Sequence, residues 1–123
     1  IDLDDFKAIN DRYGHKVGDD TLRAVARALT RRLRATDLLA RLGGDEFAVI
    51  LPHIDEEGVA VVADGLARVL PACSIDVGSD VIHPRASIGY ALIHQRTVSA
   101  DEVLVKADRA MYADKRANAG TTV

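Results

Sequence analysis

Two aspartates early in the sequence have the spacing of a metal site. In the run Ile1-Asp2-Leu3-Asp4, an extended strand would place Asp2 and Asp4 on one face and the two apolar residues on the other. Two carboxylates at a strand end can hold a hard divalent ion such as Mg²⁺, which prefers oxygen ligands. Alternatively, Asp4 or the following Asp5 caps a short helix. The run therefore predicts either a metal site or a helix cap.

A glycine pair followed by two acids is the second candidate site. Gly43 and Gly44 allow positive φ and a close backbone approach, as a tight hairpin or a phosphate cradle requires. Asp45 and Glu46 follow at the start of an apolar strand, where a fully extended backbone would send them to opposite faces. An ordinary hairpin with solvated acids is the simpler interpretation. If this strand neighbours the one at residue 2, the acids of both gather at one place.

Charge is distributed unevenly along the first 41 residues. Positions 2–20 are rich in aspartate, whereas positions 23–41 carry six arginines and a single acid, Asp37. The pattern indicates a metal site and an anion site in one domain, although helix dipoles explain part of it. Arg34 and Asp37, three residues apart, have the spacing of a local ion pair at a helix end.

The hydrophobic pattern predicts the elements that carry these residues. Apolar residues at helical spacing predict helices over about 20–34, from an N-cap at Asp55 to about 70, and after a capping box formed by Ser99 and Glu102. Extended runs predict strands over 37–42, 47–51, 74–77 and 81–92. Strands mixed with helices in this order indicate an α/β or α+β domain whose sheet is flanked by helices.

Composition excludes several classes of protein. A chain of 123 residues with 48% hydrophobic residues is one globular domain. Its net charge of -3 gives no basic field for a nucleic-acid partner, and no apolar run reaches the roughly 20 residues of a membrane span. One cysteine, Cys73, suits a reducing compartment. We therefore expect a cytoplasmic domain without nucleic-acid or membrane contact, tethered at most through regions outside this sequence.

Taken together, these motifs resemble the GGDEF family of diguanylate cyclases. The signature itself is Gly43-Gly44-Asp45-Glu46-Phe47, and the resemblance extends over essentially the whole chain. The other matching segments are 2–11, Gly14-His15, Gly18-Asp19, Ser87-Ile88-Gly89, Ala107-Asp108, Met111-Tyr112 and Lys115. The family's N-terminal helix and most of its first strand have no counterpart. We therefore expect residues 1–123 to be a GGDEF domain that lacks them.

The resemblance implies a fold and an activity. The fold would be palm-like, as in nucleotide cyclases, with a central, mostly antiparallel sheet flanked by helices. The activity would be the Mg²⁺-dependent (or Mn²⁺-dependent) condensation of two GTP molecules into cyclic di-GMP, a bacterial second messenger, with release of pyrophosphate. Each domain binds one GTP, so catalysis requires a homodimer. In full-length proteins an upstream sensory or receiver domain is expected to control it.

The resemblance also assigns roles to individual residues. Metal ligands would be Asp2, Asp45 and the main-chain carbonyl of Leu3, and either Asp45 or Glu46 would take the proton of the attacking hydroxyl. The remaining substrate-binding positions would be Phe6, Lys7, Asn10, His15, Asp19, Gly43, Gly44 and Lys115. Asn10 and Asp19 would recognise guanine, whereas His15 is equally well explained as a structural side chain beside Gly14. Ala119 stands where the family usually has a phosphate-binding arginine.

Arg34 and Asp37 match the family's inhibitory product site. In the family, an Arg-x-x-Asp motif placed five residues before the glycine pair binds cyclic di-GMP and gives feedback inhibition, and here residues 38–42 fill that interval. An alternative function is a non-catalytic domain that senses GTP or binds cyclic di-GMP. Because degenerate members usually lose an acid of the hairpin and both are present here, the resemblance favours the enzyme.

Overall fold

The computed structural model describes residues 1–94 and 99–121 as an alternating series of strands and helices. Their bounds in chain order are β1 (Asp2–Leu3), α1 (Phe6–Tyr13), α2 (His15–Arg32), β2 (Leu38–Gly43), β3 (Glu46–Ile50), α3 (Glu56–Ala72), β4 (Ile75–Asp76), β5 (Val81–Ile82), β6 (Ala86–Ser87) and α4 (Ala100–Thr121). The expected mixed α/β fold is confirmed.

The central sheet has the strand order β2-β3-β1-β6, and every pairing in it is antiparallel. The short strand β1 lies between β3 and β6, with Asp2 opposite Glu46 on one side and opposite Ser87 on the other. Strands β4 and β5 form a separate two-stranded hairpin. The two acidic motifs of the sequence are therefore on neighbouring strands.

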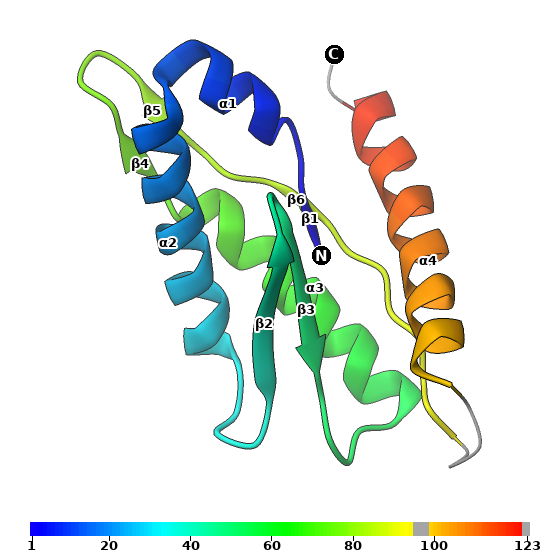
Figure 1. The fold of residues 1–123 in the computed structure, drawn as a ribbon. Coiled ribbons are helices and arrows are strands. Elements are labelled where there is room, and N and C mark those ends of the chain that lie inside the picture. Colours follow the sequence, from blue (N-terminus) through cyan, green and yellow to red (C-terminus); the bar gives the residue numbers. More distant parts are fainter. Residues whose placement is uncertain (95–98, 122–123) are drawn as a thin grey trace.

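The helices form where apolar residues recur at helical spacing. α2 and α3 pack on the sheet, and the core between them includes Val25 and Leu29 of α2 and Leu70 of α3, all fully buried (Figure 1). The Asp55 N-cap is confirmed, because its carboxylate accepts a hydrogen bond from the Gly58 amide. Among the described residues, none of the helices combines the length and apolar character needed to cross a lipid bilayer.

The predicted start of the second helix was wrong. α2 begins at His15 instead of residue 20, so Gly14 alone separates it from α1. Gly14 has φ +91°, a left-handed conformation that glycine adopts without a steric penalty. The turn at Gly14 therefore places the end of α1 directly against the beginning of α2.

The single strand predicted over 81–92 was also wrong. Only Val81–Ile82 and Ala86–Ser87 are paired, the first with β4 and the second with β1. Pro84, which lies between them, has no N–H to donate to a ladder, and at this point the chain changes its pairing partner. Beyond β6 the amide of Ile88 donates to the Asp114 carboxylate of α4, at 2.8 Å, instead of to another strand.

The contact between Gly89 and α4 is a close backbone approach. A Cβ atom at Gly89 would overlap the carbonyl oxygen of Ala107 and the amide nitrogen of Met111. Because the obstacles are backbone atoms of a helix, they cannot turn aside as a side chain can. Gly89 therefore fixes how closely α4 lies to the segment after β6 (Figure 1).

We predict that Gly89→Ala lowers the free energy of unfolding by about 1–3 kcal/mol, the range typical of steric overpacking. Gly65→Ala in α3 is the matched control, because the added methyl group there meets only the flexible end of Arg32. That variant should be neutral or more stable, by up to about 1 kcal/mol, since alanine favours a helix. Urea denaturation measures both, and equal stabilities would contradict the prediction.

Candidate functional site

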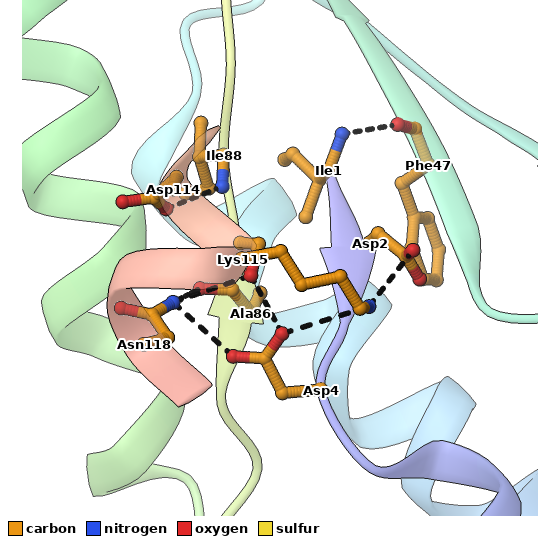
Figure 2. A network of polar contacts seen from close by, with 10 residues as sticks. Ile1, Asp2, Asp4, Phe47, Ala86, Ile88, Asp114, Lys115 and Asn118 are labelled. Carbon is orange, nitrogen blue, oxygen red and sulfur yellow. Dashed lines mark hydrogen bonds and ion pairs between the residues drawn. The ribbon is translucent and has the colours of Figure 1, made fainter. Parts of the chain in front are cut away.

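The candidate site lies where β1 ends, beside the tip of the β2–β3 hairpin and the beginning of α1. The Ile1 amino group donates to the Phe47 carbonyl at 2.8 Å (Figure 2), and the Phe47 amide donates back to the Ile1 carbonyl at 2.8 Å. The Leu3 amide donates to the Asp45 carbonyl at 3.0 Å. Because opposed residues of an antiparallel pair share a face, Asp2 and Glu46 are on the same side of the sheet. The hairpin acids are thereby brought to the aspartates of β1.

The hairpin tip has the backbone that its glycines predict. Gly43 has φ +148° and Gly44 φ +48°, and the β2–β3 register shifts between Arg41 and Gly43. Asp45 belongs to the turn before β3, so its side chain does not follow the alternation of the strand. Turn geometry therefore lets both hairpin acids approach Asp2, which a fully extended strand would prevent.

Asp2 and Asp45 form a pair of like charges. Burial, followed by the negative charge of Asp2, raises the pKa of Asp45 above its ordinary value of 3.8. The Asp2 side chain is 14% exposed, and its buried Oδ1 atom has no hydrogen-bond partner among the described residues. Two close carboxylates and an unsatisfied buried oxygen fit a divalent cation, which would neutralise both.

The protein side chains at this point make up only part of a coordination sphere. Within residues 1–94 and 99–121, no cluster of three or more His, Cys, Asp or Glu side chains is arranged to hold a metal. Mg²⁺ commonly binds through one or two carboxylates and keeps several waters, so a pair of aspartates is sufficient for it. The Leu3 side chain is buried in the core, which leaves only its backbone available to a ligand.

Lys115 of α4 lies over the two aspartates of β1. Its Nζ atom donates to Asp2 Oδ2 at 3.0 Å and is 3.8 Å from Asp4 Oδ1 (Figure 2). Burial lowers the pKa of this ammonium, but the hydrogen bond to Asp2 and three nearby carboxylates outweigh burial, so the pKa is raised above 10.5. Lys115 is thus a protonated cation at the edge of the candidate metal site.

The beginning of α1 offers backbone donors next to these carboxylates. Asp5, the N-cap residue, has φ +56°, a strained conformation for a residue other than glycine, and its side chain makes no capping hydrogen bond. Asp4 does not cap the helix either, because its carboxylate accepts hydrogen bonds from Ser87 and Asn118. The interpretation of these aspartates as helix caps was therefore wrong. Phe6 is buried, which leaves only its backbone available, whereas the Lys7 side chain is exposed.

The proposed base-recognition residues lie at the α1–α2 junction. Asn10 packs directly against Gly18, where a Cβ atom would overlap the Asn10 amide. Asp19, the next residue of α2, is exposed, as is His15 at the first position of that helix. Gly18 therefore allows the Asn10 side chain to sit against α2 beside Asp19.

Arg34 and Asp37 form the local ion pair that their spacing indicated. Arg34 donates to Asp37 through Nε and Nη2, the latter at 2.9 Å, and its Nη2 also donates to the Pro52 carbonyl. The hydrogen bond from Arg34 lowers the pKa of Asp37. The guanidinium side chain is nevertheless 52% exposed and lines a pocket of about 480 Å³ together with the first turns of α3.

Sequence reasoning missed a set of polar contacts behind the candidate site. Ser87 donates to Asp4 Oδ1 at 2.6 Å, and the Asn118 amide donates to Asp4 Oδ2 at 3.2 Å (Figure 2). At the far end of α1, Tyr13 and Arg12 both bond the Asp80 carboxylate next to the β4–β5 turn. No periodicity signals such pairings, because the partners are 67 or more residues apart in the chain.

The sequence pattern described as "Diguanylate cyclase, GGDEF domain" matches residues 1–121. The chain belongs to the GGDEF family. The domain is 40% identical over 120 residues to the probable diguanylate cyclase DgcE of Escherichia coli, covering 98% of this chain and 11% of that protein. It is 38% identical over 122 residues to the diguanylate cyclase TpbB of Pseudomonas aeruginosa, covering 98% of this chain and 28% of that protein. Across eight curated relatives, the chain spans between 11% and 32% of their length.

Solved structures agree with this assignment. The diguanylate cyclase SiaD of P. aeruginosa, in complex with its activator SiaC, has a TM-score of 0.87 and 32% identity, covering 94% of this chain and 44% of that one. The GGDEF domain of DgcB from Caulobacter crescentus, in complex with c-di-GMP, has a TM-score of 0.84 and 31% identity, covering 94% and 69%. The expected GGDEF fold is confirmed.

We predict that Asp45→Asn stabilises the GGDEF domain at neutral pH, in the absence of metal. Because the pKa of Asp45 is higher in the folded state than in the unfolded state, ionising it opposes folding, and this cost develops as the pH rises above 3.8. The gain should stay below about 1 kcal/mol, since the carboxyl is largely solvent-screened.

Urea denaturation across the pH range tests this expectation. The difference between variant and wild type should be small near pH 3, increase with pH, and level off by neutrality. Asp76→Asn, which removes an exposed carboxylate from β4, should show no such increase. A wild type more stable than Asp45→Asn at pH 7 would contradict the like-charge repulsion.

Proposed function

We propose that this GGDEF domain is a diguanylate cyclase that condenses two GTP molecules into cyclic di-GMP and releases pyrophosphate. The observation that carries the proposal is the pairing of Asp2 with the hairpin acid Asp45, which leaves a buried carboxylate oxygen unsatisfied. The family membership and the relatives named diguanylate cyclases support it.

Asp2 and Asp45, with the carbonyl of Leu3, would hold Mg²⁺ or Mn²⁺. When bound, the ion neutralises phosphate charge and lowers the pKa of the attacking hydroxyl. Phosphoryl transfer requires mainly that the reacting groups are positioned and that the phosphate charge is neutralised. The ion held by the two aspartates, together with the beginning of α1, can supply both. The N–H groups of the first turn of α1, which begins three residues after the end of β1, would bind the terminal phosphates, assisted by Lys7 and Lys115.

Guanine would be recognised at the α1–α2 junction. The Asp19 carboxylate can accept from the N1–H and the exocyclic amine of guanine, a donor pair that adenine lacks, and the Asn10 amide can pair with the purine edge. His15, the first residue of α2, would lie at the edge of this guanine site. Gly43 and Gly44 would allow the nucleotide to approach the hairpin backbone closely.

In the reaction, the 3′-oxygen of one GTP forms a bond to the α-phosphorus of the other. The bond from that phosphorus to the bridging oxygen breaks, and pyrophosphate leaves with the electron pair. Asp45 or Glu46 would accept the 3′-hydroxyl proton. Two such transfers close the ring, so two domains must face each other, each with one GTP; we propose a homodimer under the control of an upstream sensory or receiver domain.

We also propose that the domain continues upstream of Ile1 in the full-length protein. An apolar groove of about 1040 Å³ lies between β3, the segment after β6 and α4, lined among others by Ile1, Ala48, Ile50, Tyr90 and Leu104. If β1 extended upstream of Ile1 and a helix preceded it, these additional residues would cover the apolar groove.

Because GTP is a cytoplasmic nucleotide and Cys73 is a free thiol, we place the domain in the cytoplasm.

We propose in addition that Arg34 and Asp37 form a product-binding site. The exposed guanidinium can pair with a phosphate or a guanine edge, and the pocket beside it can admit part of a nucleotide. The neighbour with c-di-GMP bound shows that a domain of this fold takes that ligand. The proposal gives the domain feedback inhibition by its own product.

We predict that the wild-type domain, incubated with GTP and Mg²⁺, forms cyclic di-GMP, and that Asp45→Ala lowers the rate at least about 10²-fold, as expected for a residue that acts on the transition state. Chromatography of the products measures this. Asp76→Ala, on exposed β4, should retain the wild-type rate. If no cyclic di-GMP forms even from enforced dimers of a longer chain that includes the preceding residues, the cyclase proposal is wrong and a non-catalytic binding domain replaces it.

We predict that Arg34→Ala weakens cyclic di-GMP binding at least about tenfold, the size of a lost charge-assisted hydrogen bond to phosphate. Calorimetric titration of the product measures it. Arg68→Ala, which removes an exposed cation of α3, is the control and should bind like the wild type. Unchanged affinity in Arg34→Ala would remove this residue from the product site.

A further inference from the structure

The two aspartates of β1 differ in their partners, although the sequence makes them equivalent. Both oxygens of Asp4 accept from neutral donors, Oδ1 from Ser87 and Oδ2 from Asn118. Asp2 accepts from Lys115 at Oδ2, while its Oδ1 has no partner among the described residues (Figure 2). Asp2 therefore keeps one carboxylate oxygen without a hydrogen bond, whereas each oxygen of Asp4 already accepts one.

The donors to Asp4 are themselves held in place by two elements. Ser87 is fully buried in β6, opposite Asp2 in the sheet. Asn118 lies on α4 and donates from the same amide nitrogen to the Ala86 carbonyl at 3.3 Å and to Ser87 Oγ at 3.2 Å. The carboxylate of Asp4 therefore has two hydrogen-bond donors of its own, in addition to the Lys115 ammonium 3.8 Å from its Oδ1.

Lys115 lies one turn before Asn118 on α4 and reaches over both aspartates. Its ammonium is 3.0 Å from an oxygen of Asp2 and 3.8 Å from one of Asp4, so it is shared between the two. A cation bound at Asp2 would compete with Lys115 for that carboxylate. The Asp4 carboxylate would then be the remaining counter-ion within reach of the ammonium.

We propose that Asp4, Ser87 and Asn118 are positioning residues that retain Lys115 at the phosphate end of the site. Asp4 acts as the fixed counter-ion of Lys115 and not as a metal ligand, and Ser87 and Asn118 hold Asp4 in the required orientation. When a cation occupies Asp2, Lys115 remains beside the site and binds phosphate without first being ordered. The inference rests on the proposed GTP binding by Lys115, and it gives roles to three residues outside the GGDEF signature.

The first experiment needs neither metal nor nucleotide. Asp2→Asn removes the competing carboxylate, and ¹³C relaxation of labelled lysine then reports the mobility of the Lys115 side chain, whose signal is assigned by its loss in Lys115→Met. Lys115 should stay ordered in Asp2→Asn and become mobile in Asp2→Asn/Asp4→Asn and in Asp2→Asn/Asn118→Leu. Asp2→Asn/Arg109→Ala, which alters an exposed cation of the same helix, should leave it ordered.

Two outcomes overturn the proposal in this experiment. If Lys115 becomes mobile in Asp2→Asn alone, Asp4 does not hold it. If the Lys115 side chain stays ordered in Asp2→Asn/Asp4→Asn, a group other than Asp4 holds it. The Asp4→Asn variant keeps the test decisive even if Asn118→Leu does not fold, because it exchanges one atom and preserves the shape of the side chain.

The second experiment is a double-mutant cycle on the binding of a non-hydrolysable GTP analogue with Mg²⁺. Asn118→Leu should weaken binding about five- to tenfold when Lys115 is present, the scale of one charge-assisted contact to phosphate. In Lys115→Met the same change should have less than about a twofold effect, because no cation remains to be positioned. Equal losses in both backgrounds would show that Asn118 acts only through the fold.

The two experiments separate this inference from the proposed function. If Lys115 shows the expected mobilities but the wild type does not bind the analogue, the positioning contacts stand and GTP binding is wrong. If the wild type binds the analogue and the mobilities do not change, the function stands and the positioning role is wrong.

Discussion

The register of β1 between β3 and β6 is the constraint on which the whole site depends. Two hydrogen bonds between Ile1 and Phe47 set Asp2 opposite Glu46, and the pairing with β6 sets it opposite Ser87. A slip of one residue would turn Leu3 out of the core and Asp2 and Asp4 into it. The hydrophobic core, with Leu3 2% exposed, therefore fixes the position of the carboxylates as firmly as their own contacts do.

This register gathers negative charge, and the surrounding residues limit its cost in three ways. Asp4 is satisfied by neutral donors, Asp2 by the Lys115 ammonium, and Asp45 by the partial solvent access of a hairpin tip. What is left is the repulsion that raises the pKa of Asp45, together with one unsatisfied oxygen of Asp2. Such residual destabilisation is typical of a site that binds a cation, because the ligand and not the protein completes the neutralisation.

The sequence predicted the parts of this structure that depend on local pattern. Periodicity located α2 and α3, the Asp55 cap was confirmed, and the glycine pair predicted the hairpin. The alternation in β1 placed Asp2 and Asp4 on one face, but it could not distinguish a satisfied carboxylate from an unsatisfied one. That distinction depends on Asn118, 114 residues from Asp4, and contacts at such separation leave no periodic signal.

The two errors in the predicted elements have the same origin. The run from 81 to 92 alternates like a strand, yet Pro84 and the close approach of Gly89 to α4 divide it. The start of α2 was placed late because Gly18 and the acids after it resemble a helix entry, although Gly14 is the actual break. In both cases a tertiary contact decided between local patterns: Gly89 must fit the backbone of α4, and Gly18 must fit the side chain of Asn10.

The arrangement also restricts how the proposed product site can affect catalysis. Arg34 and Asp37 precede β2, whereas the hairpin glycines end it, six residues or about 20 Å further along the strand. The 18-residue helix α2, about 27 Å long, likewise separates His15 at its beginning from Arg34 just beyond its end, and Asp19 is about 20 Å from that end. A ligand at Arg34 would therefore not occupy the same space as the guanine that we propose at Asp19. Inhibition from that site has to act through movement of these rigid elements or of one domain against another, and it would reduce turnover without competing for GTP.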